Sequence, residues 1–156
     1  MHADTEPQFG VLSDAEAADL LQRNHLGRLA FTHHDRVDIV PISYVQNGEW
    51  IYMRTSPGGK LITVRHHPWV AFEVDEVHGL YHWDSVVVRG SIYRLAEGEN
   101  AVNRDAYQRA LEILRQFDAD ALTPHDATPH RTELLRIHVS EVSSRSARPP
   151  KVSSGE

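Results

Sequence analysis

The sequence contains no cysteine among its 156 residues, so disulfides, thiolate nucleophiles and thiolate-bound metals are all excluded. It also contains no apolar run near the ~20 residues that a membrane-spanning helix needs. Its first ten residues have neither the basic region nor the apolar region of a signal peptide. These absences predict a cytoplasmic protein with no membrane partner.

Basic residues are also scarce, because 16 Lys and Arg stand against 22 Asp and Glu, which gives a net charge of −6. A protein whose main partner is nucleic acid needs a basic surface, so that class is excluded. The hydrophobic share of 40% and the charged share of 24% are ordinary for a globular chain. We expect one domain over residues 11–146, with flexible polar tails at residues 1–10 and 147–156.

Two local signals define the first half of the chain. Ser13 followed by Glu16 matches a capping box and predicts a short helix that begins there. Asn47-Gly48 is typical of a type I′ hairpin turn, since both residues tolerate positive φ. Apolar periodicity then predicts a short helical segment at 60–66 and a long helix at 99–117, with strands at 28–32, 37–46, 49–54, 69–77, 85–95 and 133–142.

Six strands and two main helices favour a small closed antiparallel barrel over an open sheet. The strand at 85–95 is apolar on both sides. Val86, Val88 and Ile92 alternate with Val87, Tyr93 and Leu95. A barrel strand with a solvated outer face is polar at alternate positions, so the outer face of this one is expected to be covered. A second subunit is favoured over a helix as the cover.

The strongest candidate for ligand chemistry is the segment that runs from Arg54 through Thr55 and Ser56 to Lys60. It places two cations and two hydroxyls around the Gly58-Gly59 pair, at the start of the expected short helix. Phosphate groups bind to such cations, hydroxyls and exposed backbone N–H groups. A solvated surface loop is the alternative.

Two further segments are weaker candidates. Pro41 lies inside an expected strand, and proline there marks an edge or a bulge, which leaves neighbouring backbone groups free to bond a flat ligand. Trp83 and Ser85 lie where another strand begins and can pack on or bond to a ligand. A plug at the barrel end or a dimer contact explains Trp83 equally well.

Histidine is plentiful, with eleven residues, but its arrangement does not suit a metal. Adjacent pairs such as His33-His34 and His66-His67 point in different directions in a strand or a helix. We therefore predict no metal site, although a haem needs only one His and stays open. No serine elbow, phosphate-binding loop or dinucleotide fingerprint is present, and no residue is assigned as catalytic.

Taken together, several segments resemble the FMN-binding split-barrel superfamily of pyridoxamine 5'-phosphate oxidase, and more narrowly its group related to nitroimidazole resistance. The resemblance runs from about Leu12 to Arg148. The segments that carry it are Leu26–Ala30, Val40–Tyr44, Ile51–Thr55 with Gly59–Leu61, Val70–Asp75 and Trp83–Gly90.

This resemblance implies a mainly β protein, a dimeric six-stranded antiparallel split barrel, with FMN between the two subunits. It places the FMN phosphate near Arg54, Thr55, Ser56 and Lys60, with Leu61 beside them. It places the ring system along Val40, Pro41 and Ile42, with Trp83, Ser85 and Val86 nearby.

The resemblance also implies an FMN-dependent oxidoreductase. Electrons would pass from a reduced nicotinamide cofactor to a small substrate, nitro-aromatic or pyridoxal-type. Four alternatives stay open: a non-catalytic flavin-binding module, a haem-binding protein, a user of deazaflavin, and a dimeric barrel with no cofactor.

Overall fold

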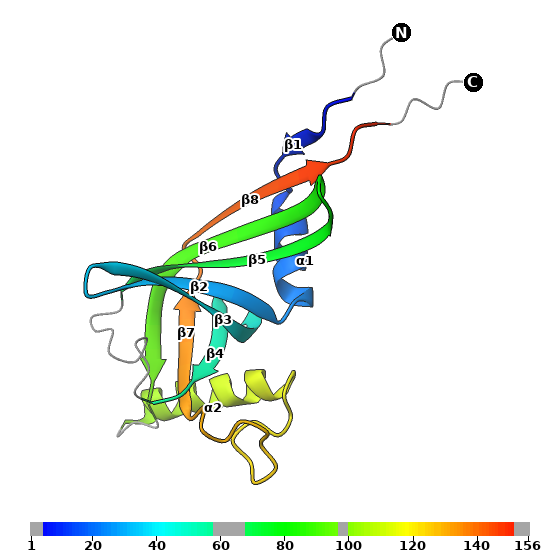
Figure 1. The fold of residues 1–156 in the computed structure, drawn as a ribbon. Coiled ribbons are helices and arrows are strands. Elements are labelled where there is room, and N and C mark those ends of the chain that lie inside the picture. Colours follow the sequence, from blue (N-terminus) through cyan, green and yellow to red (C-terminus); the bar gives the residue numbers. More distant parts are fainter. Residues whose placement is uncertain (1–4, 58–67, 97–99, 152–156) are drawn as a thin grey trace.

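A computed structural model describes residues 5–57, 68–96 and 100–151 (Figure 1). These residues form a mainly β fold with two helices, in which every strand pairing is antiparallel. The elements are β1 (Gln8–Gly10), α1 (Asp14–Arg23), β2 (Leu26–His33), β3 (Arg36–Asn47), β4 (Trp50–Thr55), β5 (Trp69–Gly79), β6 (His82–Leu95), α2 (Ala101–Arg115), β7 (Glu133–His138) and β8 (Glu141–Arg148).

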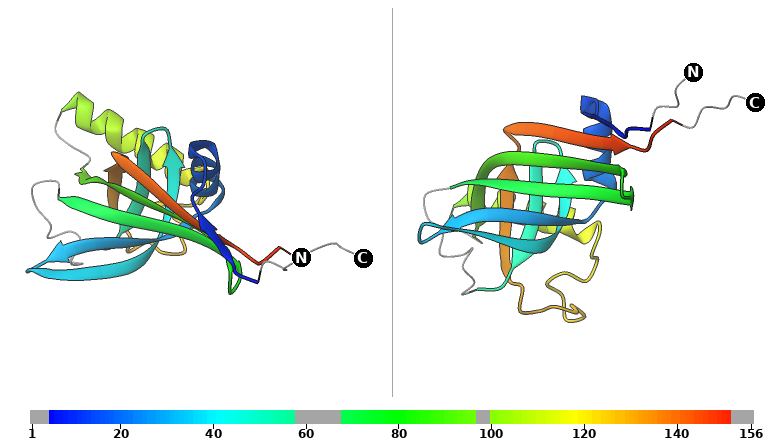
Figure 2. Two further views of the ribbon diagram at one scale, coloured as in Figure 1. Left: turned by 90° about the horizontal axis from the view of Figure 1, so that it is seen from above. Right: turned by 45° about the horizontal axis from the view of Figure 1, so that its top comes forward.

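Six of these strands close into a ring, in the order β2, β3, β4, β7, β6, β5 and back to β2. The ring confirms the predicted six-stranded split barrel. β8 pairs with β6 outside the ring, and β1 pairs with β8. The long strands β5, β6 and β8 run together, while β4 and β7 cross behind them (Figure 2).

The predicted strand at 133–142 is two strands in the structure. β7 pairs with the last part of β6, from Ile92 to Leu95, whereas β8 pairs with its first part, from Trp83 to Arg89. Gly90 lies between these two parts of β6. A Cβ at that position would lie 1.7 Å from the carbonyl oxygen of His138. The missing side chain therefore lets β7 end against β6 and β8 begin beside it.

The predicted hairpin between β3 and β4 is confirmed, but its turn lies one residue later. Asn47 pairs with Trp50, so the two turn residues are Gly48 and Glu49. Of these, only Gly48 has a positive φ, at 59°. The prediction of a type I′ turn centred on Asn47-Gly48 was therefore wrong in register. A single positive φ at the first turn position needs a glycine there and nowhere else.

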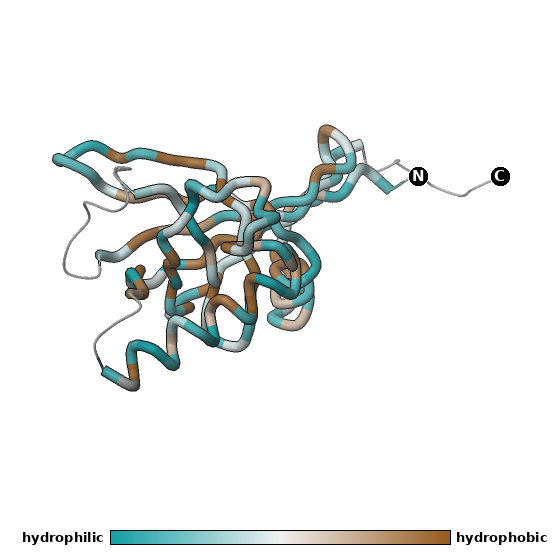
Figure 3. The backbone as a smooth tube through the Cα atoms, turned by 90° about the horizontal axis from the view of Figure 1, so that it is seen from below, coloured by the Kyte–Doolittle hydropathy of each residue, from teal (hydrophilic) through white to brown (hydrophobic). Residues whose placement is uncertain are grey.

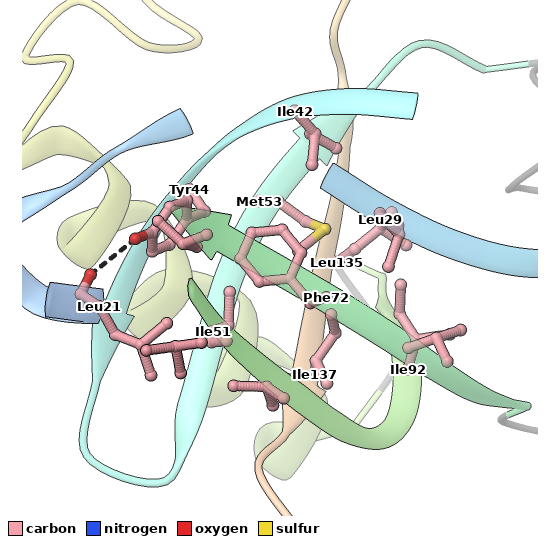
Figure 4. Close-up of a cluster of buried hydrophobic side chains, with 14 of the residues drawn as sticks. Leu21, Leu29, Ile42, Tyr44, Ile51, Met53, Phe72, Ile92, Leu135 and Ile137 are labelled. Atoms are coloured by element: carbon pink, nitrogen blue, oxygen red, sulfur yellow. Dashed lines mark hydrogen bonds between the residues drawn. The ribbon is translucent and has the colours of Figure 1, made fainter. Parts of the chain in front are cut away.

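The main core fills the barrel (Figure 4). Phe72, Leu29, Met53 and Ile137 are fully buried in it. The capping box of Ser13 and Glu16 begins α1 as predicted, and this helix covers one end of the barrel. There the buried Tyr44 hydroxyl donates to the carbonyl oxygen of Leu21 over 2.7 Å.

A second cluster lies between α2 and the β4–β7 side of the barrel, where apolar positions gather on one side of the helix (Figure 3). Leu95 of β6 belongs to it and is 8% exposed. The cover over this part of β6 is therefore α2, where the sequence favoured a second subunit. Earlier along the strand, Val86 and Val88 share one side, as predicted, and this side faces the core. Val87 on the other side is half-buried.

The close passage at Gly90 gives a direct test of the barrel. Gly90→Ala is expected to destabilise the protein by about 3 kcal/mol, because the new methyl meets backbone that cannot move aside. Gly79→Ala is the matched control, since the nearest atom to its Cβ is 4.0 Å away. Urea unfolding of both variants measures the effect. Equal stabilities would contradict the described contact between β6 and β7.

The attachment of α1 gives a pH-dependent test. Glu76 of β5 accepts hydrogen bonds from Arg23 at 2.7 and 2.8 Å and from Asn24 at 2.6 Å. Chiefly through Arg23, these bonds lower the pKa of Glu76 from 4.5 to about 2. The stabilisation is thus complete above pH 4.5 and is lost as the pH falls toward 2.

Glu76→Gln should therefore reduce the free energy of unfolding by about 1 kcal/mol or less at pH 7, because Arg23 is half-exposed. The difference from the wild type should shrink steadily as urea titrations move from pH 5 to pH 3. A difference that does not change with pH would show that the carboxylate charge plays no part.

Candidate functional site

The barrel is open between β3 and β4. β3 pairs with β4 only from Tyr44 onward, so within the described residues its first part, 36–43, has β2 as its single neighbour. A cleft of about 600 Å³ lies beside this free edge. We call it the β3 cleft. The end of β4 and the segment before β7 line its other side.

The β3 cleft brings together six of the predicted site residues. They are Val40, Pro41 and Ile42 from β3, and Arg54, Thr55 and Ser56 from the end of β4. Pro41 lies on the free-edge part of β3, which is the placement that the sequence suggested for a proline within a strand. The strongest candidate segment and one of the two weaker ones therefore line one cavity.

Three other predicted residues do not line this cleft within one chain. Val86 is fully buried in the barrel core. The Ser85 hydroxyl donates to Glu73 over 2.8 Å. Trp83 lies beside Phe9, with 6.5 Å between ring centroids. Lys60 and Leu61 fall outside the described residues.

Arg54 is the most constrained side chain at the cleft. It is 9% exposed and forms a bidentate ion pair with Asp126, with N–O distances of 2.7 and 2.8 Å. It also donates to Asp118 at 3.2 Å, to the Thr128 hydroxyl at 3.0 Å and to the carbonyl oxygen of Arg131 at 3.2 Å. Arg54 thus fastens residues 118–131, which contain no helix or strand, to β4.

Asp126 is the main partner of Arg54 in that segment. Its side chain has no exposed surface, and it accepts the backbone N–H groups of Leu122 and Thr128 as well as Arg54. The hydrogen bonds from Arg54 are the main reason that the pKa of Asp126 lies well below its usual range. Asp126 therefore stays ionised at neutral pH and neutralises the charge of Arg54.

Among the cleft residues that were not predicted from the sequence are His130 and Arg131. Both side chains are exposed, and both follow the segment that Arg54 fastens. Their segment lies between the predicted helix at 99–117 and the predicted strand at 133–142, but no spacing in the sequence connects Arg131 with Arg54. The three acidic residues of the loop, at positions 118, 120 and 126, were the only available sign that it could pair with a buried cation.

A second cavity, of about 240 Å³, adjoins the β3 cleft. Ser43, Arg54 and Arg131 line both cavities. Leu114 and Phe117, at the end of α2, give the smaller cavity an apolar wall. Arg54 and Arg131 therefore lie where the β3 cleft, which has both polar and apolar lining residues, meets the smaller cavity.

The described residues contain no cluster of three or more metal-ligating side chains. Neither described helix is long and apolar enough to cross a membrane.

The family model for pyridoxamine 5'-phosphate oxidase matches residues 13–146. That range contains the whole ring of six strands and both sides of the cleft. The chain belongs to this family. The match confirms the resemblance that the sequence segments suggested.

Two solved structures of similar proteins support the assignment to the pyridoxamine 5'-phosphate oxidase family. A FAD-binding protein from Mesorhizobium loti is 27% identical, with a TM-score of 0.68, over 88% of this chain and 96% of that one. The FAD-binding protein from Mycobacterium smegmatis is 25% identical, with a TM-score of 0.61, over 88% and 99% of the two chains.

More distant relatives share the fold. A structure assigned to the 5-nitroimidazole antibiotic resistance proteins, from Bacteroides thetaiotaomicron, has a TM-score of 0.68 at 13% identity, over 90% of this chain and 88% of that one.

Among curated sequences, the uncharacterized protein RA0666 of Rhizobium meliloti (strain 1021) is 34% identical over 85 residues. That match spans 54% of this chain and 56% of the relative.

The Arg54–Asp126 pair can be tested by removing one partner or both. Arg54→Met leaves a buried carboxylate without its cation and is expected to lower Tm by roughly 5–10 °C. Adding Asp126→Asn to this variant removes the unpaired charge and should restore part of the loss. Thermal unfolding of the single and double variants decides the point. Equal or lower stability of the double variant would contradict the pairing.

Proposed function

We propose that this protein binds a flavin in the β3 cleft and works as an oxidoreductase. Electrons would pass from a reduced nicotinamide cofactor, through FMN, to a small substrate of the nitro-aromatic or pyridoxal type. The observation that carries the proposal is that one cleft joins the free edge of β3 to the hydroxyl-bearing end of β4.

The two sides of the cleft fit the two parts of a flavin. The edge of β3 offers unpaired backbone groups within the described residues, and Val40 and Ile42 beside it are apolar. A flat ring with amide-like edges needs this combination. Thr55 and Ser56 offer hydroxyls at the other side, and Lys60 and Leu61 follow a few residues later in the sequence. Hydroxyls and cations are suited to a phosphate.

The relatives add support for a flavin. The two solved structures at 25% and 27% identity are described as FAD-binding proteins. FAD and FMN share the ring and the first phosphate, so both are compatible with the same cleft. A volume of about 600 Å³ is in the usual range for small-molecule and cofactor sites.

The flavin would supply the redox chemistry, because amino-acid side chains do not accept a hydride and pass it on. The chain's own residues hold and orient it: the β3 edge at the ring, and the end of β4 at the phosphate. The apolar side chains limit access of water to the ring and tune its electronics. No side chain is assigned as an acid or a base.

We also propose a homodimer, in which Trp83 and Ser85 reach the site of a second copy. Trp83 and Ser85 lie on β6 away from the cleft of their own chain. Large apolar side chains are exposed on β3, where Val37 is 81% and Ile39 is 61% exposed. Exposed apolar side chains that adjoin one another on one strand are suited to contact with a partner.

The test is the absorption spectrum of the purified protein, followed by titration with FMN. A retained flavin spectrum, or tight binding of added FMN, is expected. Ser43→Trp places an indole in the cleft without a change of charge and should raise the Kd of FMN at least tenfold. Val102→Trp, at a position of α2 that is 76% exposed, is the control and should leave Kd unchanged.

Each other outcome has a distinct meaning. Equal Kd values for Ser43→Trp and the control would place the flavin outside the β3 cleft. A protein that neither retains nor binds FMN would contradict the proposed function, and a Soret band would indicate a haem instead. Bound flavin that reduced nicotinamide fails to reduce would favour a non-catalytic flavin-binding module.

A further inference from the structure

We propose that Arg131 provides the cation that contacts the flavin phosphate, and that the Arg54–Asp126 pair positions it. This inference rests on the proposed flavin-binding function and gives Arg54 an indirect part in it. Arg54 would act through the segment that it fastens, as a positioning residue.

The terminal N–H groups of Arg54 already have acceptors within the protein. Its two terminal nitrogens carry four N–H groups, and five acceptors of the protein lie around them. Two of these acceptors belong to the buried Asp126, and a third belongs to Asp118. A phosphate beside these nitrogens would therefore meet carboxylates and a cation whose charge is already neutralised. Electrostatics disfavour a direct contact.

Arg131 is in the opposite situation. Its side chain is exposed and lines the β3 cleft, and its guanidinium has no hydrogen bond or ion pair with the rest of the described chain. The hydroxyl-bearing residues Thr55 and Ser56 and the imidazole of His130 line the same cleft. A guanidinium with unused donors beside two hydroxyls suits a phosphate, since it can form charge-assisted, two-fold hydrogen bonds.

The backbone of Arg131 is held in place although its side chain is not. Its carbonyl oxygen accepts from Arg54 over 3.2 Å, and its N–H donates to the carbonyl oxygen of Thr128 over 3.1 Å. Thr128 in turn contacts Arg54 through its hydroxyl and Asp126 through its N–H. The ion pair thus fixes the point at which the Arg131 side chain leaves the backbone. Such fixing lowers the entropy lost when a ligand binds.

The carboxylate that lines the cleft, Asp38, does not oppose this assignment. It lies on β3 opposite Phe31, toward the turn between β2 and β3. Arg131 lies with Arg54 at the end of the cleft that borders the second cavity. The anionic group of the ligand is therefore expected at the β4 end, and the uncharged ring along β3.

Asp126→Asn gives opposite results for the two possible roles of Arg54. If Arg54 is a positioning residue, the variant loosens the segment and raises the Kd of FMN several-fold. If Arg54 binds phosphate directly, the variant releases its charge and lowers that Kd. Riboflavin, which lacks the phosphate, is the matched probe, and its Kd should not change.

Arg131→Gln tests the direct contact and leaves the buried pair intact. It should raise the Kd of FMN about tenfold, the value of one charge-assisted hydrogen bond, with no change for riboflavin. Arg109→Gln, at an exposed position of α2, is the charge-matched control and should change neither. Combining Asp126→Asn with Arg131→Gln should add little to Arg131→Gln alone, since both act on one contact.

Four results would overturn the inference and leave flavin binding intact. They are tighter FMN binding in Asp126→Asn, equal loss of FMN and riboflavin binding in that variant, unchanged FMN binding in Arg131→Gln, and equal affinity of the wild type for FMN and riboflavin. Failure of the wild type to bind either flavin would instead contradict the proposed function itself.

Discussion

The architecture depends on the double use of β6. Its first part pairs with β5 and β8, and its last part closes the ring through β7. The two parts meet at Gly90, where β6 passes so close to His138 that a side chain has no room. Because the ring closes on that side, β3 is able to leave β4 on the other side without loss of the core. The free edge of β3 and the cleft beside it are consequences of this arrangement.

The cleft then depends on a second interaction of long range. Arg54 and Asp126 are 72 positions apart in the chain, and their ion pair attaches a segment without regular structure to the end of β4. Burial makes the pair costly to break, because either partner alone would be a charge without compensation. The same contacts bring His130 and Arg131 to the cleft. A pair that stabilises the fold thus also determines which cation faces the cavity.

The sequence predicted the local features well, because each depends on neighbours in the chain. The capping box of Ser13 and Glu16 and the free edge near Pro41 were correct. The hairpin at Gly48 was correct except for its register. The division of the last predicted strand into β7 and β8 was missed, since it follows from a contact between Gly90 and His138 across the barrel. The cover of Leu95 by α2 was missed for the same reason.

For the site, the sequence located both sides of the cleft but not the partner of Arg54. Arg54 was predicted to bind phosphate because it precedes two hydroxyls. Nothing in the spacing revealed that Asp126 would neutralise it. Trp83 and Ser85 were weaker candidates from their place in the sequence, and the resemblance added Val86. All three stay a prediction, which for Trp83 and Ser85 depends on a second copy of the chain. Lys60 and Leu61 likewise stay a prediction.

The central claim is that the β3 cleft holds the flavin. A crystal structure of the protein grown with FMN tests it most directly. The expected result is electron density for the ring along Val40, Pro41 and Ile42, with the phosphate beside Thr55, Ser56 and Arg131. Density for FMN at any other place, with the β3 cleft filled by water, would contradict it.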